Sequence, residues 1–534
     1  MRGAIDIAAL PDDPAVLRGL LAEVIAQRDG AVAERDALEA ANDRLRHLLR
    51  RLQRHQFGRR SERLPEEQLQ LALADLETAV AAAEAKEEHL DEALRKTRAE
   101  GRRRSRGALP AHLLRVEVLI EPESAACPCC QGAMAVIGED RAERLDVIPA
   151  RFRVLVTRRP KLACRACGDV VVQAPAPPRL IEGGLPTETT VAHVLVSRYA
   201  DHLPLYRQAG MLARQGVPVD RSTLAHWVGT AATEIEPVVR HLREVLLASA
   251  RLFADETVVP VLDPGRGRTK QGYFWAIARD DRPWGGLDPP AVVYTYAPGR
   301  GGEHAHALLG RYRGILQCDG YAAYKRLAEP GATPGAPPGA VVIATCWAHA
   351  RRRFYDLARS GASPVADGAL RRIAALYAVE TELRGQPPDV RRAGREAQSQ
   401  PLVEDLFAWL EEHLARVPGR GDLAEAIRYA LKGREGLTRF LEDGRIDLDT
   451  NAVERAIRPI ALSRKNALFA GSDIGGEHWA VIASLIETCK LNGVDPQAYL
   501  AAVITLIVQG HPNSAIDELM PWQFKPSDRL AAVA

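Results

Sequence analysis

The sequence has few aromatic residues and no long uninterrupted apolar stretch. Phe, Trp and Tyr make up 5% of its 534 residues, so leucine, valine, isoleucine and alanine should build most of the core. No run reaches the length of a membrane span, and the first residues meet acid and proline too early for a secretory signal. We therefore expect a soluble, intracellular protein with no membrane partner. The length predicts roughly three or four domains.

The chain also lacks an excess of one charge and any internal repeat. Its formal net charge of +2 neither favours nor excludes nucleic acid as a partner. The glycine-rich stretch GSDIGGE (471–477) lacks the Gly-Lys-Ser/Thr ending of a phosphate-binding loop, so nucleotide binding there is rejected. Positive charge is concentrated in RKTRAEGRRRSRGALP, which is typical of a solvated linker but could also bind DNA phosphates. The clustered arginines are Arg102, Arg103, Arg104 and Arg106.

The amino-terminal region, residues 1–100, favours helix. Over residues 12–56 a stripe of apolar or small side chains recurs every seven positions. The stripe comprises Leu17, Val24, Ala31, Leu38, Leu45 and Leu52. The companion positions are weak, so a self-pairing coiled coil and a helix lying on another domain both stay open. A second helix is expected over about residues 66–98.

The eight cysteines favour metal binding over a disulfide framework. CPCC supplies Cys127 and Cys130, and CRAC supplies Cys164 and Cys167. Two C-x-x-C pairs are a strong signature of a closed, tetrahedral, structural Zn²⁺ site. Cys129 is spare and could compete as a ligand, and four unliganded thiols are the alternative. Strand-like runs surround both pairs, so we expect a basic linker and zinc-binding domain over residues 101–180.

Residues 187–248 predict a helical DNA-binding domain. In LPLYRQAGMLARQGVPVDRSTLAHWVG, Gly216 and Pro218 separate two helices, and Asp220 or Ser222 could cap the second. A helix-turn-helix places such a second helix in a DNA groove, whereas a plain helical hairpin fits the pattern equally well. The candidate DNA-contacting residues on its first turns are Arg221, Ser222, Thr223 and His226.

Three carboxylates occupy positions that suit metal-dependent chemistry. Asp255 lies in the strand-like run RLFADETVVPVL, Asp319 ends a second such run, and Glu454 begins a helix. Converging over a mixed sheet, they could hold two Mg²⁺ or Mn²⁺ ions for phosphoryl transfer. Each also has a structural explanation: solvent exposure, a turn, or a capping box between Glu454 and Asn451. Because successive strand residues face opposite ways, Asp255 should point toward the metal and Glu256 away.

Several longer blocks, in one order along the chain, resemble the transposases of the insertion sequence 66 family. They run from HQFGRRSERL to DELMPWQF and include CPCC…CRAC, ADETVVPVLDPGRGRTKQGYFWAIARDDRPWGG, LQCDGYAAY, CWAHARRRFYDL and DTNAVERAIRPIALSRKNALFAGSDIGGE. Their number and order make the resemblance specific. The acid triplet alone would not be.

The resemblance implies a DDE-type DNA transposase with a multidomain α+β fold. Its α/β catalytic core would be ribonuclease-H-like and interrupted by a helical insertion. Asp255, Asp319 and Glu454 would be the catalytic acids, which bind Mg²⁺ or Mn²⁺. The core is expected at residues 249–345 and 446–515, with the insertion at residues 346–445 and a tail at residues 516–534.

CWAH resembles the C-x-x-H pattern that many such transposases carry after the second aspartate. This implies a supporting role for Cys346 and His349, with a buried cysteine and a capping histidine as the alternative. Arg455, Arg458, Arg464 and Lys465 lie near the third acid in the sequence, where a DNA backbone would pass or where a helix would face solvent.

The implied partners are the terminal inverted repeats and target DNA. The resemblance further implies a homo-oligomer on DNA, accessory transposition proteins, and a cytoplasmic, nucleoid-associated location in bacteria. The alternative function is a zinc-dependent DNA-binding regulator whose ribonuclease-H-like fold has no catalytic activity.

Overall fold

The computed structural model describes residues 13–26, 28–30, 32, 91–105, 152–163, 171–263, 268–329, 331, 339–361, 363–467 and 469–525. The chain divides into two compact units, Met1–Ala150 and Arg151–Ala534. The mixed α+β fold expected from the sequence is confirmed, with helices in the majority. None of the helices in the described part of the chain is long and apolar enough to cross a membrane.

In the first unit the described residues are almost all helical. Residues 14–26 belong to the helix expected over residues 12–56, and the heptad positions after Val24 lie outside the described residues. Helix α3 (Glu92–Ser105) runs past its expected end, so the arginines at 102–104 lie in a helix and not in an irregular linker. Arginine is a good helix former, and Lys96 and Arg95 approach Glu92 one turn earlier, which favours the helix.

The second unit begins with short strands and a helical block. β1 (Lys161–Ala163) pairs antiparallel with β2 (Val171–Gln173), and residues 152–160 are not in a strand, so the strand expected there is much shorter. The helical block is confirmed as α4 (Glu188–Tyr199), α5 (Leu205–Arg214) and α6 (Arg221–Leu247). The Thr187 side chain caps α4, and Gly216, with φ of +79°, ends the turn after α5.

A five-stranded mixed sheet forms the centre of this unit, in the order β5-β4-β3-β6-β7. Strands β3, β4 and β5 form an antiparallel meander, and β6 and β7 run parallel to β3. All five occur where the sequence has β-favouring apolar runs that predict strands: RLFADETVVPVL, GYFWAIARDD, AVVYTYAP, GILQCDGY and AVVIATCWAH. Their bounds are β3 (Arg251–Asp263), β4 (Arg268–Arg279), β5 (Ala291–Ala297), β6 (Gly314–Cys318) and β7 (Val341–Thr345).

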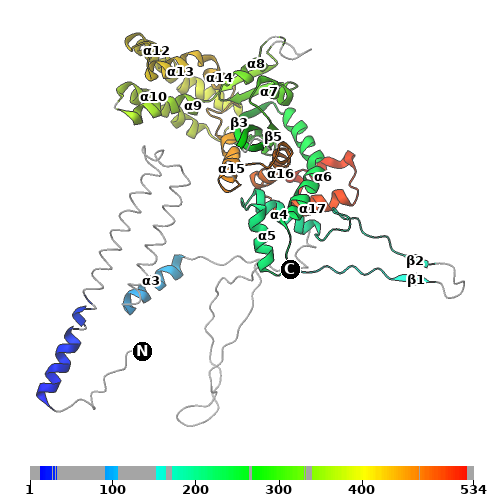
Figure 1. Cartoon of the computed structure of the whole chain (residues 1–534). Coiled ribbons are helices and arrows are strands. Elements are labelled where there is room, and N and C mark those ends of the chain that lie inside the picture. The colour runs from blue at the N-terminus through cyan, green and yellow to red at the C-terminus, as the bar shows by residue number, and fades with distance from the viewer. Residues whose placement is uncertain are drawn as a thin grey trace. The chain divides into compact units, whose positions relative to one another are not determined.

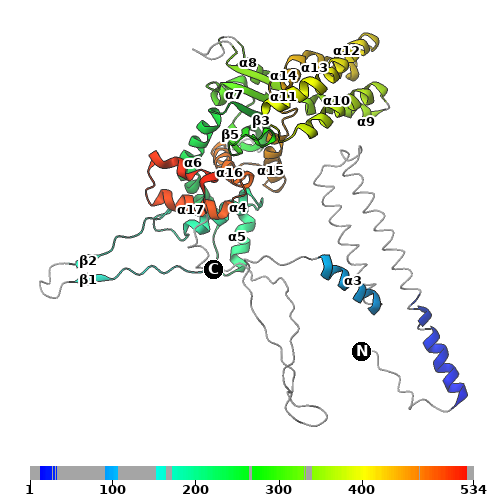
Figure 2. The same cartoon turned by 180° about the vertical axis from the view of Figure 1, so that it is seen from behind.

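Helices cover both faces of the sheet (Figures 1 and 2). On one face lie α7 (Gly302–Leu309) and α8 (Ala322–Leu327), which the sequence did not predict. There Tyr324 packs edge-on against Trp275 of β4, with ring centroids 5.8 Å apart. On the other face lie α15 (Asn451–Ala467) and α16 (Asp473–Leu491), where Trp479 packs against Phe274 at 5.1 Å.

The carboxyl-terminal elements complete the helical layer around α16. α17 (Pro496–Val508) packs against α4, and the 3₁₀ turns Asn513–Leu519 and Pro521–Gln523 follow, with a further one, Arg282–Trp284, after β4. The glycines of residues 471–477 predict a loop, and this prediction is wrong. Ser472 accepts from the Gly475 amide as the N-cap of α16, so most of that stretch is the first helical turn.

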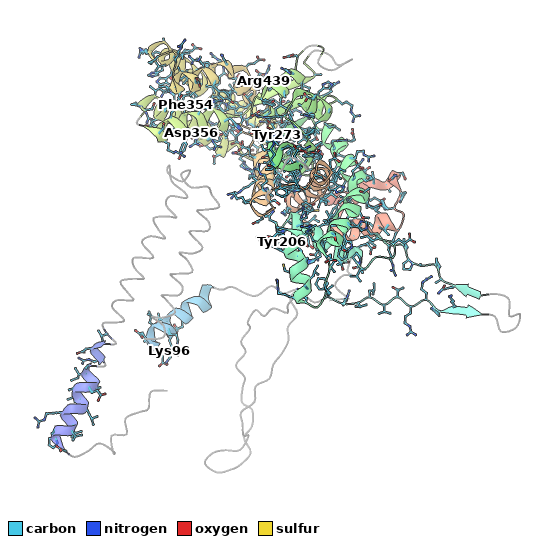
Figure 3. The ribbon with its side chains drawn as sticks, viewed as in Figure 1. Lys96, Tyr206, Tyr273, Phe354, Asp356 and Arg439 are labelled. Atoms are coloured by element: carbon cyan, nitrogen blue, oxygen red, sulfur yellow. The ribbon has the colours of Figure 1, made fainter. Side chains whose placement is uncertain are left out.

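Between β7 and α15 the chain forms the expected helical insertion, which has a hydrophobic core of its own. In α9, Phe354 is buried in that core and Asp356 is exposed, and both are labelled in Figure 3. The elements are α9 (Trp347–Ser360), α10 (Pro364–Leu383), α11 (Pro388–Gly394), a π-helical turn (Arg395–Ser399), α12 (Gln400–Arg416), α13 (Asp422–Lys432) and α14 (Arg434–Glu442).

Arg395 is fully buried in the insertion and links three of its segments. Its guanidinium binds Glu380 of α10 through two hydrogen bonds of 2.6 and 2.7 Å. It also donates to the carbonyl oxygens of Phe440, Asp443 and Ile446, at 2.8, 3.2 and 2.8 Å. These carbonyls belong to the end of α14 and the segment that leads to α15, so the arginine fixes the path of that segment.

Replacing Arg395 with methionine should therefore destabilise the chain strongly. The change removes the closer of the two arginine partners of Glu380, leaving Arg391 at 3.2 Å, and frees three buried carbonyls, which together should cost about 3–5 kcal/mol in the free energy of unfolding. Arg416→Met is the control, because its pair with Glu412 is exposed and should be worth less than about 1 kcal/mol. Urea unfolding followed by circular dichroism measures both, and equal effects would contradict this role.

Candidate active site

Strand β3 sends its two adjacent acids to opposite faces of the sheet. Asp255 pairs with Ala276, and Glu256 with Trp275, across the antiparallel ladder. The Glu256 carboxylate is 1% exposed, forms an ion pair with Arg300 and accepts from the Tyr324 hydroxyl at 2.6 Å. Both carboxylate oxygens of Glu256 therefore have partners on the face covered by α7 and α8, and Glu256 points away from Asp255 as the sequence predicts. Asp255 faces the side covered by α15 and α16.

Asp255 and Asp319 come together because of the parallel register between β3 and β6. Arg251 pairs with Ile315 and Phe253 with Gln317. Continued two residues beyond the paired segment, this register brings Asp255 level with Asp319, which directly follows β6. Asp319 closes a turn by accepting from the Tyr321 amide at 2.7 Å, and Gly320, with φ of +83°, lets the chain turn there.

Glu454 is placed by the start of α15. Asp449 accepts from the Asn451 amide at 3.1 Å, and the Thr450 carbonyl accepts from the Glu454 amide at 3.2 Å. The Thr450 hydroxyl donates to the Glu454 carboxylate at 3.2 Å. The residue that contacts Glu454 at the helix start is therefore Thr450, whereas the sequence suggested Asn451.

The environment of Asp255 disfavours its negative charge. Burial, followed by repulsion from Glu256, Asp319 and Glu454, raises the pKa of Asp255 to about 7. The Glu256 amide, which donates to Asp255 at 2.8 Å, acts in the opposite direction. Asp319 and Glu454 thus both lie close enough to Asp255 for their charges to raise its pKa. A divalent cation would remove the repulsion and let Asp255 ionise.

The three carboxylates do not form the tightest cluster of metal-binding groups. Within the described ranges, the only set of three His, Cys, Asp or Glu donors lying within 4.8 Å of one another is Cys346, His349 and Glu454. A site for two cations tolerates a wider spread of carboxylates, because its outer ligands bind different ions. Glu454 is therefore common to the predicted acid triad and to a second group of donors.

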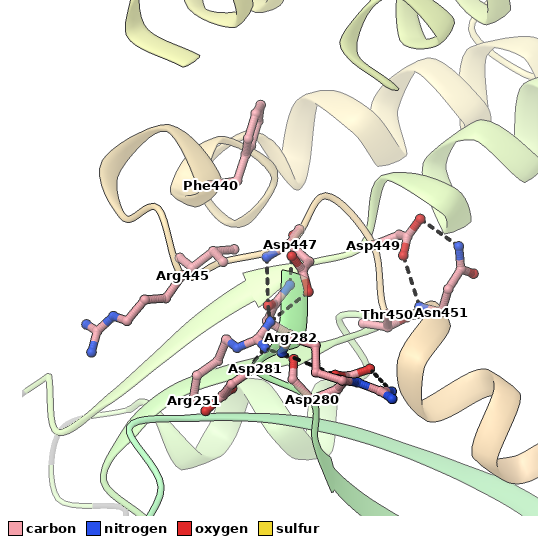
Figure 4. A network of polar contacts seen from close by, with 12 residues as sticks. Arg251, Asp280, Asp281, Arg282, Phe440, Arg445, Asp447, Asp449, Thr450 and Asn451 are labelled. Carbon is pink, nitrogen blue, oxygen red and sulfur yellow. Dashed lines mark hydrogen bonds and ion pairs between the residues drawn. The ribbon is translucent and has the colours of Figure 1, made fainter. Parts of the chain in front are cut away.

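A buried polar network determines where the segment before α15 lies (Figure 4). Arg251 of β3 donates to Asp447 at 2.9 Å and to Gln317 of β6 at 3.0 Å. Gln317 in turn exchanges hydrogen bonds with the Asp447 backbone, at 2.8 and 3.0 Å. From the insertion, Arg391 reaches the other Asp447 oxygen at 3.0 Å. The strands that carry the two aspartates thus also hold the segment that leads to Glu454.

Two further side chains near the acids were not found from the sequence. Arg300, after β5, pairs with Glu256 and stacks on the Tyr321 ring at 4.0 Å. Tyr429 of α13 donates its hydroxyl to the Asp319 carbonyl at 3.1 Å, beneath Arg353 at 4.0 Å from its ring. Nothing in the local pattern indicates either contact, because each joins segments far apart in the chain.

Comparison with known protein families shows which family this chain belongs to. The family model "Transposase IS66 family" matches residues 183–478, more than half of the chain. The chain belongs to the IS66 transposase family. Further family models match in order: "Transposase C of IS166 homeodomain" at residues 44–118, "zinc-finger binding domain of transposase IS66" at residues 124–168 and "IS66 C-terminal element" at residues 484–522.

Curated relatives of this IS66 chain come from Sinorhizobium fredii and are themselves uncharacterized. The protein y4qI is 45% identical over 98% of this chain and 99% of its own length. The protein y4jD is 44% identical over 81% of this chain and 84% of its own. The protein y4hP is 36% identical over 92% and 89%. The similarity to y4qI and y4hP therefore covers nearly the whole chain.

The zinc-finger match of the IS66 family spans the two C-x-x-C pairs, which supports a structural zinc. Cys127, Cys130, Cys164, Cys167 and the spare Cys129 lie outside the described residues. Their assignment as ligands stays a prediction.

The expected DNA-contacting residues of this IS66 chain differ in their exposure. Arg221, Ser222, Thr223 and His226 are exposed at the start of α6, and α5, which precedes them, exposes Tyr206 (Figure 3). On α15, Arg455, Arg458 and Lys465 are exposed, whereas the Arg464 guanidinium donates to the Val258 carbonyl of β3. Arg464 thus has a structural contact that the sequence did not suggest.

Asp255→Asn should stabilise the protein, and the gain should depend on pH. An asparagine keeps the hydrogen bond from the Glu256 amide but carries no charge. In the parent, the folded-state pKa of about 7 lies above the ordinary 3.8, so rising pH ionises the unfolded chain first and lowers stability between those values. The gain should grow from about pH 4 to about pH 7 and then level off. At pH 8 it should raise the melting temperature by at least about 2 °C.

Thermal unfolding at several pH values without divalent cations measures this gain. Asp405→Asn serves as the control, because that carboxylate is exposed and paired with Arg372 on the insertion. A difference between Asp255→Asn and the parent that is constant with pH would rule out the crowded-carboxylate environment.

Proposed function

We propose that this chain is a DNA transposase that cleaves the ends of an insertion sequence and joins the freed 3′-hydroxyls to target DNA. The observation that carries the proposal is the parallel register of β3 and β6, which directs Asp255 and the residue after β6, Asp319, toward one place, together with the effect of the Glu454 charge on Asp255. Membership of the IS66 transposase family supports the same reaction.

The strand order β5-β4-β3-β6-β7 supports a ribonuclease-H-like core for this function. In such a core, acids on neighbouring parallel strands and on a later helix surround one reaction centre. Here β3 and β6 supply the aspartates and α15 supplies the glutamate, and the helical insertion precedes α15. We assign the catalytic role to Asp255, Asp319 and Glu454 on this basis.

The acid set suits hard divalent cations such as Mg²⁺ or Mn²⁺, because all its donor atoms are carboxylate oxygens. When bound, such cations lower the pKa of the attacking hydroxyl and stabilise the leaving oxygen. Asp255 and Asp319 would hold the reacting phosphate at the sheet edge through these cations, and Glu454 would complete the set from α15. Water would attack at the element end, and the released 3′-hydroxyl would then attack the target phosphodiester in line.

DNA would reach this centre along surfaces on several elements. The exposed start of α6 would contact the terminal repeats, together with the zinc finger and the arginines of α3. Both element ends must be held at once, so we propose a homo-oligomer on DNA in which the amino-terminal helices pair the subunits. Companion proteins would assist, as the family resemblance implies.

Neutral substitution of any one acid should abolish the reaction and leave DNA binding intact. Asp255→Asn, Asp319→Asn and Glu454→Gln should each lower Mg²⁺-dependent cleavage of an end-containing duplex by at least about 10³-fold, because the cations lose a ligand. Asp405→Asn should cleave like the parent. Gel-based cleavage and strand-transfer assays, with mobility shifts run in parallel, measure these effects. Normal DNA binding without metal-dependent cleavage in the parent would favour the non-catalytic regulator.

Arg221→Ala should weaken DNA binding across sequences if its charge meets a phosphate. Loss of one phosphate contact should reduce the slope of log affinity against log salt by about 1. Arg240→Ala is the matched control on the same helix, because Arg240 pairs with Glu236 in its second half. Fluorescence anisotropy at several salt concentrations measures both slopes, and identical slopes for the two variants would remove the start of α6 from the DNA interface.

A further inference from the structure

Cys346, His349 and Glu454 bring three different metal-binding donors together from two helix starts. Cys346 is the N-cap of α9 and is buried, His349 lies on the first turn of that helix, and Glu454 lies on the first turn of α15. One donor atom of each lies within 4.8 Å of the other two. Thiolate, imidazole and carboxylate together suit Zn²⁺ and chemically similar cations, whereas Mg²⁺ prefers oxygen ligands only.

One nitrogen of the His349 ring, Nδ1, faces Glu454 but has no hydrogen-bond partner. Its Nδ1 atom is buried and makes no hydrogen bond, although most buried polar atoms in proteins have one. The nearest carboxylate oxygen, Oε1 of Glu454, is 3.8 Å away, which is too far for a hydrogen bond. Two ligands of one tetrahedral zinc ion lie roughly 3.4 Å apart, given bonds of about 2.1 Å. The separation therefore suits a cation between the two side chains.

The backbone and Thr450 hold the ligands in place without a cation. The Trp347 amide donates to the Leu448 carbonyl at 3.0 Å, which joins the starts of the two helices. The Thr450 amide donates to Cys346 Sγ at 3.3 Å, and its hydroxyl donates to Glu454 at 3.2 Å. Contacts of this kind from outside the ligand set orient ligands and increase metal affinity.

We propose that Cys346, His349 and Glu454 form a binding site for a thiophilic divalent cation of the Zn²⁺ class. Three protein ligands leave the fourth tetrahedral position open. On binding, the Cys346 thiol proton passes to solvent and the thiolate takes its place as ligand. The site differs from the four-cysteine zinc site expected in the zinc finger, with which it shares no residue.

The site has a consequence for activity that rests on the proposed function. Glu454 belongs to both ligand sets, so a Zn²⁺ ion bound to Cys346 and His349 draws its carboxylate away from Asp255 and Asp319. A thiophilic cation therefore inhibits the Mg²⁺-dependent reaction by occupying a shared ligand.

Cobalt(II) binding to the full, metal-stripped chain under reducing conditions tests the site itself. Co²⁺ replaces Zn²⁺ and gains a thiolate-to-metal absorption band when a cysteine binds it. The parent should bind one more Co²⁺ per chain than Cys346→Ser, since the zinc finger contributes equally to both. His349→Gln should weaken Co²⁺ binding at this site by at least about 100-fold. Loss of a residue that only supports a ligand costs about 10–100-fold in metal affinity, and loss of a direct ligand should cost more. Cys489→Ser is the matched control, since Cys489 is another buried free thiol, on α16.

Equal Co²⁺ stoichiometry and affinity in the parent and both site variants would overturn the proposal. If circular dichroism shows that Cys346→Ser does not fold, His349→Gln decides alone, because its partly exposed ring can be replaced without opening the core.

Inhibition is measured separately, as the Zn²⁺ concentration that halves Mg²⁺-supported cleavage. That concentration should rise at least about tenfold in His349→Gln, measured against the variant's own activity in Mg²⁺ alone. An unchanged value in the variant would overturn the inhibitory role. If the parent cleaves no DNA, the proposed function fails, whereas Co²⁺ binding still tests the site.

Discussion

The ion pairs of Asp447 hold the central sheet and the helical insertion in one arrangement. One oxygen of its carboxylate accepts from Arg251 of β3 and the other from Arg391 of α11. Both arginine side chains are almost completely buried, so neither can find water if the contact is lost. Desolvation offsets most of the attraction in such pairs, but only one geometry satisfies them all. We infer that this network contributes mainly to the positioning of α15.

That positioning matters because β3 and β6 lead to two neighbouring groups of charged side chains. In one group the charges are paired, and in the other the carboxylates repel one another. Arg251 and Gln317 hold Asp447 in a network whose charges are paired. Further along, Asp255 of β3 feels repulsion from Asp319, just after β6, and from Glu454 of α15, and no ion pair within the described residues neutralises it. The nearby guanidinium of Arg300 is paired with Glu256 on the other face. A fold that pairs its buried charges at one level and leaves acids uncompensated at the next indicates a binding site there.

The local pattern of the sequence predicted much of this architecture. Alternating and continuous apolar runs gave all five strands of the sheet, and glycine and proline at 216 and 218 gave the break between α5 and α6. Asp255 and Asp319 could be singled out because each interrupts or ends an apolar strand. Short helices with weak patterns, such as α8, were missed. Residues 471–477 were misjudged, because glycines that usually break helices lie in the first turn of one capped by Ser472.

Contacts between distant segments could not be predicted in this way. The fully buried Arg395 is one of many arginines in the sequence, and nothing nearby shows that Glu380 and three carbonyls will surround it. The same holds for Thr450, whose hydrogen bonds to Cys346 and Glu454 depend on the insertion returning to the sheet. The two aspartates follow from strand register, whereas the position of Glu454 depends on the whole insertion.

This dependence explains how one carboxylate could serve both proposed sets of ligands. The aspartates follow from the strand register and offer only oxygen, so they would select hard cations. Cys346 and His349 are placed by the start of α9 and would select softer ones. Glu454 comes from α15, which is tied to α9 through Trp347 and Leu448 and to the sheet through Asp447. A small change in the insertion would therefore shift Glu454 between the two sets, and the cation that binds more tightly would fix its position.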